Sequence, residues 1–203
     1  LSFEEGEDSL RVDVELKNTG AQAGKEVVQV YAGKPIGKLG KAARTLEAFA
    51  KTELLEPGQS QKLSLSFSKE QLASYDDSGI TGHKSSYVLE AGEYKIYAGS
   101  DVRKAELAGS FEIDTLQVIE ELEEACAPVE SFERLKVEPD GTIAKEEVPQ
   151  RTIDLEARIA ADRPEAISYT GDQGIKLKDV YQNQSSLEDF IAQLNDEDLV
   201  CLM

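Results

Sequence analysis

Residues 10–31 restrict the fold more than any other part of the chain, because they contain two strand patterns around one tight turn. In residues 10–17 apolar and polar side chains alternate, which is typical of a strand with one buried and one solvated face. Asn18 and Gly20 tolerate the positive φ angles that a chain reversal needs. After Gly24 the chain continues into a run of β-branched residues. This segment therefore predicts two neighbouring strands joined by a hairpin or a sandwich corner.

Strand patterns and turn signals recur after this segment. Turns such as Pro57-Gly58 and Ala91-Gly92 separate short stretches of alternating polarity, and one helical turn is expected after a Ser68 cap. The chain up to residue 113 then holds about seven strands in about 110 residues, the size and strand count of an immunoglobulin-like two-sheet sandwich. The later strands are expected at 46–53, 61–67, 86–90, 94–98 and 105–113. The side chains expected inside the sandwich are Val12, Val14, Val28, Val30, Leu65, Phe67, Tyr94 and Ile96.

Six motifs follow one another in this half of the chain. They are Asn18-Thr19-Gly20, Gly24 to Tyr31, Leu46 to Lys51, Leu55 to Ser60, Leu72 to Asp76 and Leu89 to Tyr94. In this order they resemble the fibronectin type III-like domain that is appended to family 3 glycoside hydrolases, the β-glucosidase group. Two features depart from that pattern: Ala48 stands where the family usually has Gly, and the Gly/Lys-rich segment 34–44 replaces a proline-rich loop.

The periodicity changes after residue 113. Apolar residues recur at helical spacing in residues 116–125 and predict a short acidic helix that ends before Pro128, although Val118 and Ile119 would also suit a strand. Residues 128–152 contain prolines among charged residues, which indicates an extended segment with a turn at Asp140-Gly141.

Short elements are expected in the last fifty residues. Asp154 is placed as the cap of a helix that ends at Ala161. Residues 167–172 predict a strand that enters a turn. Two capping boxes, Ser185 with Glu188 and Asn195 with Asp198, predict two short helices.

The segments 167–180 and 187–199 resemble the connector of a subset of family 3 enzymes in which the sandwich precedes the catalytic barrel. The resemblance implies a mainly β fold with two parts: a sandwich at 1–113 and an acidic, partly helical connector at 114–203 that leads to a missing barrel domain. The chain starts at Leu1 and stops inside an expected helix, so we expect it to be a piece of a longer polypeptide.

Charge is distributed unevenly along the chain. Residues 1–113 carry 14 Lys/Arg against 18 Asp/Glu, whereas residues 114–203 carry 8 against 22, which contribute −4 and −14 to the net charge of −18. Such an acidic chain repels phosphate backbones and anionic lipids, and no apolar run is long enough to span a bilayer. We therefore expect neither nucleic acid nor a membrane as a partner. Cys126 and Cys201 lie far apart without C-x-x-C partners, which predicts reduced thiols in a bacterial cytoplasm.

Residues 32–45 contain four Lys or Arg and no acidic residue. Two interpretations fit this basic stretch: a flexible loop that reaches toward an acidic surface such as a catalytic cleft, or a solvated mobile loop. We favour the solvated loop, because Lys combined with Gly is the usual composition of exposed loops. An oligosaccharide near 34–44 is kept as an additional partner hypothesis.

No residue is assigned a catalytic, cofactor-binding or metal-binding role, and no cofactor is expected. Glycoside hydrolysis needs two carboxyl groups that flank the scissile bond. The resemblance places the nucleophile of the family in a Ser-Asp-Trp context in the barrel, and this chain has no Trp and no Lys-His motif. The single histidine, His83, fits an exposed loop residue better than a ligand or a base.

Three further candidate sites are set aside. Asp76-Asp77 and residues 196–198 lack the alternating ligands and the Gly of a calcium loop. Cys126 and Cys201 have no neighbouring His or Lys that would lower a thiol pKa, so plain burial is favoured over a nucleophilic role.

The sequence therefore predicts a non-catalytic, structural part of a family 3 glycoside hydrolase of carbohydrate metabolism, which packs against and positions the catalytic domains of the same polypeptide. The alternative is an autonomous carbohydrate-binding or protein-interaction module. Sugar platforms present flat aromatic side chains, whereas here Trp is absent and aromatics make up 6% of the residues. Most of these aromatics are expected on strand faces that the core needs, so the structural role is favoured. A third hypothesis, that the chain is itself an enzyme, has no identified acid–base pair.

Overall fold

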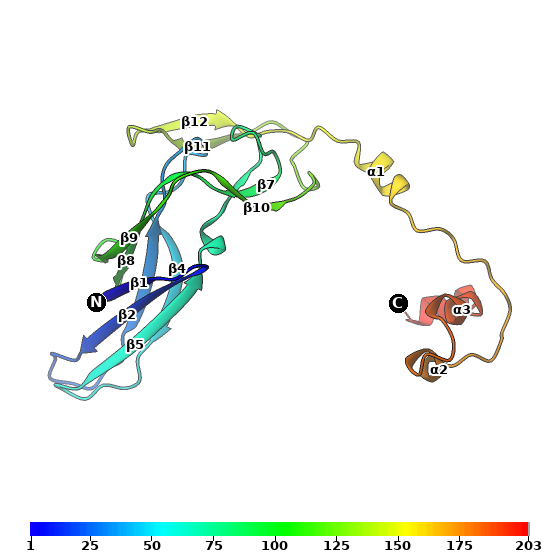
Figure 1. The fold of residues 1–203 in the computed structure, drawn as a ribbon, viewed down its shortest axis with the longest axis horizontal. Coiled ribbons are helices and arrows are strands. Elements are labelled where there is room, and N and C mark those ends of the chain that lie inside the picture. Colours follow the sequence, from blue (N-terminus) through cyan, green and yellow to red (C-terminus); the bar gives the residue numbers. More distant parts are fainter. Residues whose placement is uncertain (203) are drawn as a thin grey trace. The chain divides into compact units, whose positions relative to one another are not determined.

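The computed structural model describes residues 1–202, which divide into two compact units: residues 1–153 and the unit that begins at Asp154. Within the described residues the β-strands lie in the first unit and the α-helices in the second (Figure 1). Each unit is described by itself below.

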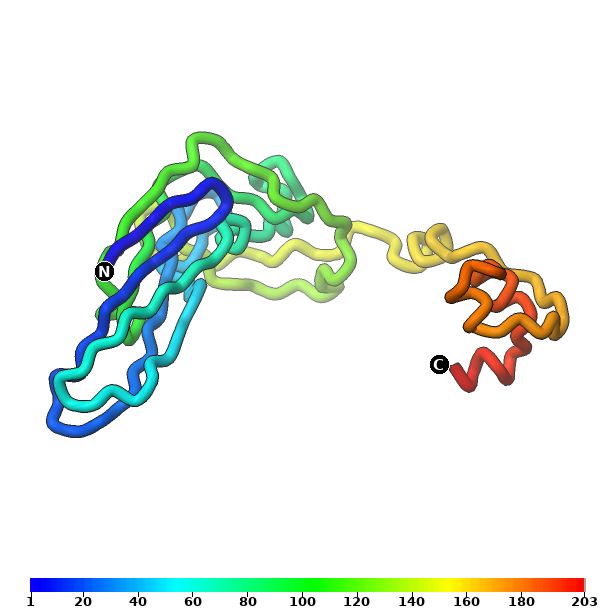
Figure 2. Tube along the Cα trace, turned by 60° about the horizontal axis from the view of Figure 1, so that its bottom comes forward, coloured from blue at the N-terminus to red at the C-terminus, as the bar shows by residue number. Residues whose placement is uncertain are grey.

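Seven strands of the first unit form two antiparallel sheets. The first sheet has the order β1-β2-β5, and the second has the order β4-β3-β8-β9. Figure 2 shows the N-terminal strands β1 and β2 running beside β5. This arrangement confirms the predicted fibronectin type III-like sandwich, but two strands differ from the prediction: Ser2–Glu5 was not expected, and the strand expected at 86–90 belongs to a third sheet. The strands are β1 (Ser2–Glu5), β2 (Ser9–Lys17), β3 (Val27–Gly33), β4 (Thr45–Lys51), β5 (Ser60–Ser68), β8 (Gly92–Gly99) and β9 (Glu106–Ile113).

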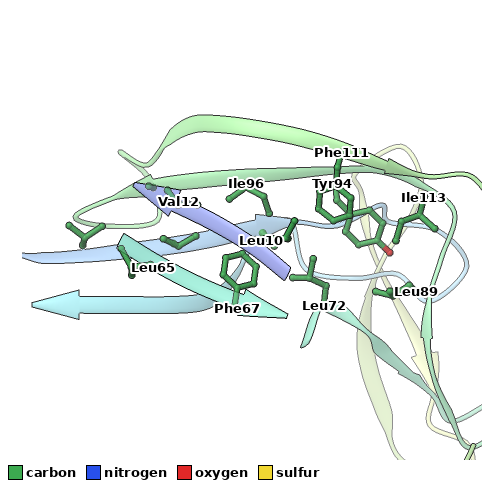
Figure 3. Packing of buried hydrophobic residues seen from close by; sticks show 14 residues of the cluster. Leu10, Val12, Leu65, Phe67, Leu72, Leu89, Tyr94, Ile96, Phe111 and Ile113 are labelled. Carbon is green, nitrogen blue, oxygen red and sulfur yellow. The ribbon is translucent and has the colours of Figure 1, made fainter. Parts of the chain in front are cut away.

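The register between β2 and β5 creates the core between the two sheets. Leu10 pairs with Phe67 and Val12 with Leu65, so that all four side chains point to the same face. From the opposite sheet Tyr94, Ile96 and Phe111 meet them (Figure 3). Seven of the eight predicted core residues are buried, and the eighth, Val14, is partly buried and packs against the same cluster.

Tyr94 is the largest of the fully buried side chains. Its ring stacks on Phe111 with centroids 5.2 Å apart and an interplanar angle of 20°. Its hydroxyl donates a hydrogen bond of 2.9 Å to the carbonyl oxygen of Glu90. Burial raises the pKa of Tyr94, so the phenol stays a neutral donor. The ring therefore fills the core without leaving an unpaired polar atom.

A third sheet and a hairpin extend the first unit beyond the sandwich. The third sheet has the order β10-β7-β6, and β11 pairs with β12 as a separate hairpin. The predicted turn at Asp140-Gly141 lies in this hairpin, where Gly141 has a φ of 84° and Asp140 accepts hydrogen bonds from Thr142. The 3₁₀-helix η1 follows Ser68, whose hydroxyl accepts from Gln71 N, as predicted. These elements are η1 (Glu70–Leu72), β6 (Ser74–Asp76), β7 (Ser86–Leu89), β10 (Gln117–Glu121), β11 (Glu133–Val137) and β12 (Ile143–Glu147).

The acidic helix predicted at 116–125 is wrong, because this segment contains strand β10. Val118 and Ile119 are β-branched, β10 pairs with β7, and Ile119 packs against the core of the sandwich. The pairing continues past the strand, since Leu122 N donates to Ser85 O at 3.0 Å. The apolar residues of 116–125 have helical spacing, but pairing with the edge of β7 and packing against the core stabilise a strand instead. The last strand of the sandwich ends at Ile113, but the compact unit continues to Ile153.

The second unit contains four short helices, and their caps agree with the sequence in part. Asp154 accepts from Ala157 N at 3.0 Å, as predicted. Asn195 and Asp198 exchange the two hydrogen bonds of the second predicted capping box. The first predicted cap lies one residue later, where Ser186 Oγ accepts a hydrogen bond of 3.0 Å from Asp189 N. The helices are α1 (Leu155–Ala161), α2 (Leu177–Tyr181), α3 (Leu187–Ala192) and α4 (Asp196–Leu202).

The strand predicted at 167–172 is also wrong. The segment is irregular, and Thr170 N donates to Ala192 O at the end of α3. Gln193 holds the neighbouring loop as well: its side chain is buried, accepts from Gln173 N and Ile175 N, and donates to Ile175 O. Thr170 N is thus paired with a helix end, and the loop that follows the segment is held by one glutamine, instead of either pairing with a neighbouring strand.

The core assignment predicts opposite outcomes for two phenylalanines of the sandwich. Phe67 is buried in the core, whereas Phe49 on β4 is 68% exposed. Phe67→Ala should lower the free energy of unfolding by about 3–5 kcal/mol, because it leaves a cavity in addition to the lost apolar contact. The matched control Phe49→Ala should change it by less than about 0.5 kcal/mol. Chemical denaturation of both variants is the measurement, and equal losses would contradict the observed register.

Candidate functional site

The basic segment 34–44 is held down by two buried ion pairs. Lys34 Nζ lies 3.3 Å from a carboxylate oxygen of Glu47, and Lys41 Nζ lies 2.6 Å from Glu90 Oε2. All four side chains are nearly inaccessible to solvent. The favoured expectation of a solvated loop is therefore wrong for these two lysines. The sequence could not reveal the pairs, because it does not show which carboxylates face the loop.

Glu90 is the centre of this arrangement. Its Oε1 accepts a hydrogen bond of 2.7 Å from Lys38 N, in addition to the ion pair with Lys41. Gly37 has a φ of 57°, and a Cβ there would collide with the Glu90 carboxylate. Burial lowers the pKa of Lys41, and the Glu90 carboxylate only partly offsets this effect. The close approach of loop and carboxylate thus depends on the glycine.

Arg44 is the third cation of the segment that contacts other parts of the first unit. Its guanidinium lies over the Tyr97 ring at 3.8 Å from the centroid and donates to Val102 O at 2.6 Å. Lys38 is exposed. Three of the four cations therefore stabilise the loop itself, which does not support a basic arm that reaches toward an acidic partner.

A second polar cluster surrounds Glu124, which is buried next to the third sheet. Its carboxylate accepts from Lys84 Nζ at 2.6 Å, from Thr152 N at 2.7 Å and from Thr152 Oγ1 at 2.8 Å. The Lys84 ammonium and the two Thr152 donors lower the pKa of Glu124 to about 2. This carboxylate therefore ties the end of the first unit to the loop before β7.

Arg134 on β11 forms a third cluster. It donates to Asp77 Oδ1 at 3.0 Å and to Glu146 Oε1 at 2.7 Å, and the pair with Asp77 is bidentate. The Asp77 and Glu146 carboxylates raise the pKa of Arg134 above its ordinary value. The cluster connects the hairpin β11-β12 to the loop after β6.

Asp76 organises the loop between β6 and β7. It is fully buried and accepts backbone hydrogen bonds from Gly79, Ile80 and Thr81, and its neighbour Ser78 donates through both N and Oγ. Burial raises the pKa of Asp76, but the hydrogen bonds, led by those from Thr81, outweigh it and leave the pKa below its usual value. Asp76 thus has a structural explanation without any metal ion.

The remaining sequence candidates lie apart. His83 is a half-buried residue of the loop before β7. Cys126 and Cys201 are free and exposed, so the expectation of burial is wrong. Residues 196–198 form the first turn of α4. Within residues 1–202 no group of three His, Cys, Asp or Glu could hold a metal ion.

A concave pocket of about 470 Å³ lies beside the third sheet, between Tyr75 and Tyr87 on one side and Cys126, Pro128 and Pro149 on another. The sequence analysis did not predict it, because its lining comes from four separate segments. In the described chain no helix combines the length and the apolar composition that a membrane span needs.

Comparisons with known proteins agree with this architecture. Residues 26–102 match the family described as fibronectin type III-like domain. The chain is 47% identical over 197 residues to a β-glucosidase of Ruminococcus albus, which covers 97% of this chain and 21% of that protein. It is 34% identical to β-glucosidase A of Butyrivibrio fibrisolvens, and the match covers 97% of this chain and 26% of that protein. The chain thus spans about a fifth to a quarter of the length of these relatives.

Solved structures give the same result. A β-glucosidase from Paenibacillus barengoltzii matches 98% of this chain and 23% of its own, with 50% sequence identity and a TM-score of 0.87. β-Glucosidase 3B from Thermotoga neapolitana, solved in complex with α-D-glucose, matches 58% of this chain at 37% identity and a TM-score of 0.51. Some relatives therefore share nearly the whole chain and others only about half of it.

The buried pair beneath the basic segment predicts a large cost for one substitution. Lys41→Met should lower the free energy of unfolding by about 3–5 kcal/mol, because it leaves the Glu90 carboxylate buried without its cation. The control Lys38→Met, an exposed lysine of the same segment, should have an effect below about 0.5 kcal/mol. Urea denaturation measures both. Adding Glu90→Gln to Lys41→Met should recover part of the loss, and a neutral Lys41→Met variant would contradict the pair.

The lowered pKa of Glu124 predicts a specific dependence of stability on pH. Its ordinary pKa is 4.5 and its pKa in the folded chain is about 2, so its carboxylate contributes stability above pH 4.5 that is lost as the pH falls toward 2. Glu124→Gln should therefore be less stable than the wild type at neutral pH, with the difference shrinking between these two values. Thermal unfolding across this range is the measurement, with exposed Glu121→Gln as the control. A difference that is independent of pH would contradict the assignment.

Proposed function

The chain carries a fibronectin type III-like domain and matches a segment of glycoside hydrolase family 3 β-glucosidases, and from this premise we propose that it is a non-catalytic accessory part of such an enzyme. In this proposal the chain packs against the catalytic domains of the same polypeptide and holds them in position. The relatives that share nearly all of this chain are four to five times as long, which supports the presence of such domains.

The main observation behind the proposal is that the apolar side chains of the second unit are exposed. None of its four helices contains a buried residue, although each bears apolar side chains. Tyr181 is 88% exposed, and Leu177, Leu187 and Val200 are exposed as well. Apolar side chains gathered on short helices favour a partner surface that covers them. A neighbouring domain of the same polypeptide supplies such a surface.

The absence of a catalytic role in this chain is part of the proposal. Three of its buried or half-buried carboxylates, those of Asp77, Glu90 and Glu124, are held by Arg134, Lys41 and Lys84. A glycosidase needs one carboxyl group free to protonate the leaving group and one free to attack or to activate water. The clusters described above therefore favour structural roles.

The proposed organisation places the sandwich at 1–113 and an acidic connector at 114–203 before a barrel domain. The part of the connector up to residue 153 completes the first compact unit through β10 and the hairpin β11-β12. The free thiols of Cys126 and Cys201 support a location in the bacterial cytoplasm.

The competing function is a carbohydrate-binding module. The sequence argued against it on the ground that the aromatic side chains are needed in the core. Tyr75 and Tyr87 are exceptions, since both are exposed. This observation keeps the second function under consideration, in addition to the accessory role.

The proposal predicts that the purified chain does not hydrolyse p-nitrophenyl β-glucoside. In the full-length polypeptide, Tyr181→Asp should lower the temperature of activity loss by about 2–4 °C or more, because it places a charge in a covered apolar contact. In the isolated chain the same variant should leave the unfolding temperature unchanged. Gln184→Asp, at an exposed polar neighbour, is the matched control. Hydrolysis by the chain alone, or equal effects of the two variants, would overturn the proposal.

A further inference from the structure

The pocket beside the third sheet has the size and lining of a small-molecule site. Its volume of about 470 Å³ lies within the range of about 300–1,000 Å³ that is common for ligand pockets. Strands β6 and β7 form one wall, and the irregular segment after β10 forms another; β7 and β10 lie side by side in Figure 1. The lining residues are Tyr75, Asp77, Ser85, Tyr87, residues 122–128 and Pro149.

Two tyrosine rings dominate the sheet side of this pocket. Tyr75 and Tyr87 are directly opposite each other in the pairing of β6 with β7, and their ring centroids are 5.2 Å apart at an interplanar angle of 55°. Each is 40% exposed, whereas their strand neighbours Asp76, Ser86 and Val88 are buried. Strand alternation thus places both rings on the outer face, outside the sandwich core. Two adjacent exposed aromatic rings in a concave site indicate a binding surface.

The polar groups of the pocket define the chemistry of its ligand. Three carboxylates line the pocket, those of Asp77, Glu123 and Glu124. Asp77 is paired with Arg134 and Glu124 with Lys84, so two of the three are already neutralised by cations of this chain. A cationic ligand would therefore gain little from these carboxylates. The oxygens of Asp77, Ser85 and the two phenols remain suited to accept hydrogen bonds. A neutral ligand that carries several hydroxyl donors and one apolar face matches this arrangement.

We propose that this pocket binds a neutral pyranose, with the C–H face of the sugar ring against one of the two tyrosine rings and its edge against the other, since the rings are inclined at 55°. The hydroxyl groups of the sugar donate to the surrounding oxygens. The occupant is a mono- or disaccharide of neutral sugars. The first unit contains the entire pocket. The inference therefore rests on the competing carbohydrate-binding function and not on the accessory role.

The test is a titration of the purified 203-residue chain, with its tyrosine rings labelled with ¹³C, by glucose and by cellobiose. Saturable shifts of the ring signals of Tyr75 and Tyr87 are expected, while the other five tyrosines stay unchanged. Tyr87→Ala should weaken binding at least tenfold, because it removes half of the aromatic surface. Tyr87→Phe keeps the ring and should retain binding within about fivefold, because it removes only one neutral hydrogen bond, which contributes about 1 kcal/mol.

Tyr169→Ala, at an exposed tyrosine of the second unit, is the matched control and should bind like the wild type. Circular dichroism confirms the folding of each variant, and Tyr87→Phe remains informative if Tyr87→Ala fails to fold. Three results overturn the inference: no saturable shift up to the solubility limit of either sugar, shifts that Tyr87→Ala leaves unchanged, or saturation of the two rings by tetramethylammonium chloride in place of the sugars. The third result would identify a cation site instead.

Discussion

The antiparallel pairing of β2 with β5 is the contact on which the first unit depends. Its register fixes which side chains face the second sheet, so that Leu10 and Val12 join Leu65 and Phe67 under Tyr94. A shift of β2 by one residue against β5 would turn Leu10 and Val12 toward solvent and bring Arg11 into the core. The third sheet and the hairpin β11-β12 are then added to a sandwich that already has its apolar centre. Each addition is fastened by a charged cluster, through Glu124 for the third sheet and through Arg134 for the hairpin.

The strands of the sandwich could be predicted from the sequence because their signal is local. Alternation in residues 10–17 and 61–67 reports a face of a sheet without reference to any partner. The segment around Ile119 failed for the opposite reason: its spacing suited a helix, and only the open edge of β7 and the neighbouring core made it a strand. The strand predicted at 167–172 failed because a period-2 pattern needs a partner, and the backbone there pairs with the end of α3.

The polar sites could not be predicted from local sequence patterns, because each joins residues that are distant in the sequence. Lys41 and Glu90 come from separate loops and meet only when β8 returns beside β3, so neither residue is distinctive in the sequence. The same holds for Tyr75 and Tyr87, whose common outer face results from the pairing of β6 with β7. Gly37 was the one residue whose identity pointed to such a contact, because a glycine allows the backbone of a basic loop to approach a carboxylate closely. Its partner could not be named without the fold. The Gly/Lys-rich composition of this loop also led to a wrong prediction. It suggested a solvated loop, but Lys34 and Lys41 pair with buried carboxylates.

The two units illustrate different sources of stability. The first unit has a continuous apolar core of residues drawn from both sheets of the sandwich, together with paired charges at its margins. The second unit is held by helix caps at Asp154, Ser186 and Asn195 and by the side chain of Gln193. Caps and single hydrogen bonds each contribute about 1 kcal/mol, which is less than the conformational entropy of the residues that they order. In the accessory role that we propose, another domain of the same polypeptide would cover the exposed side chains of Tyr181 and Leu187 and supply the remaining stability of this part of the chain.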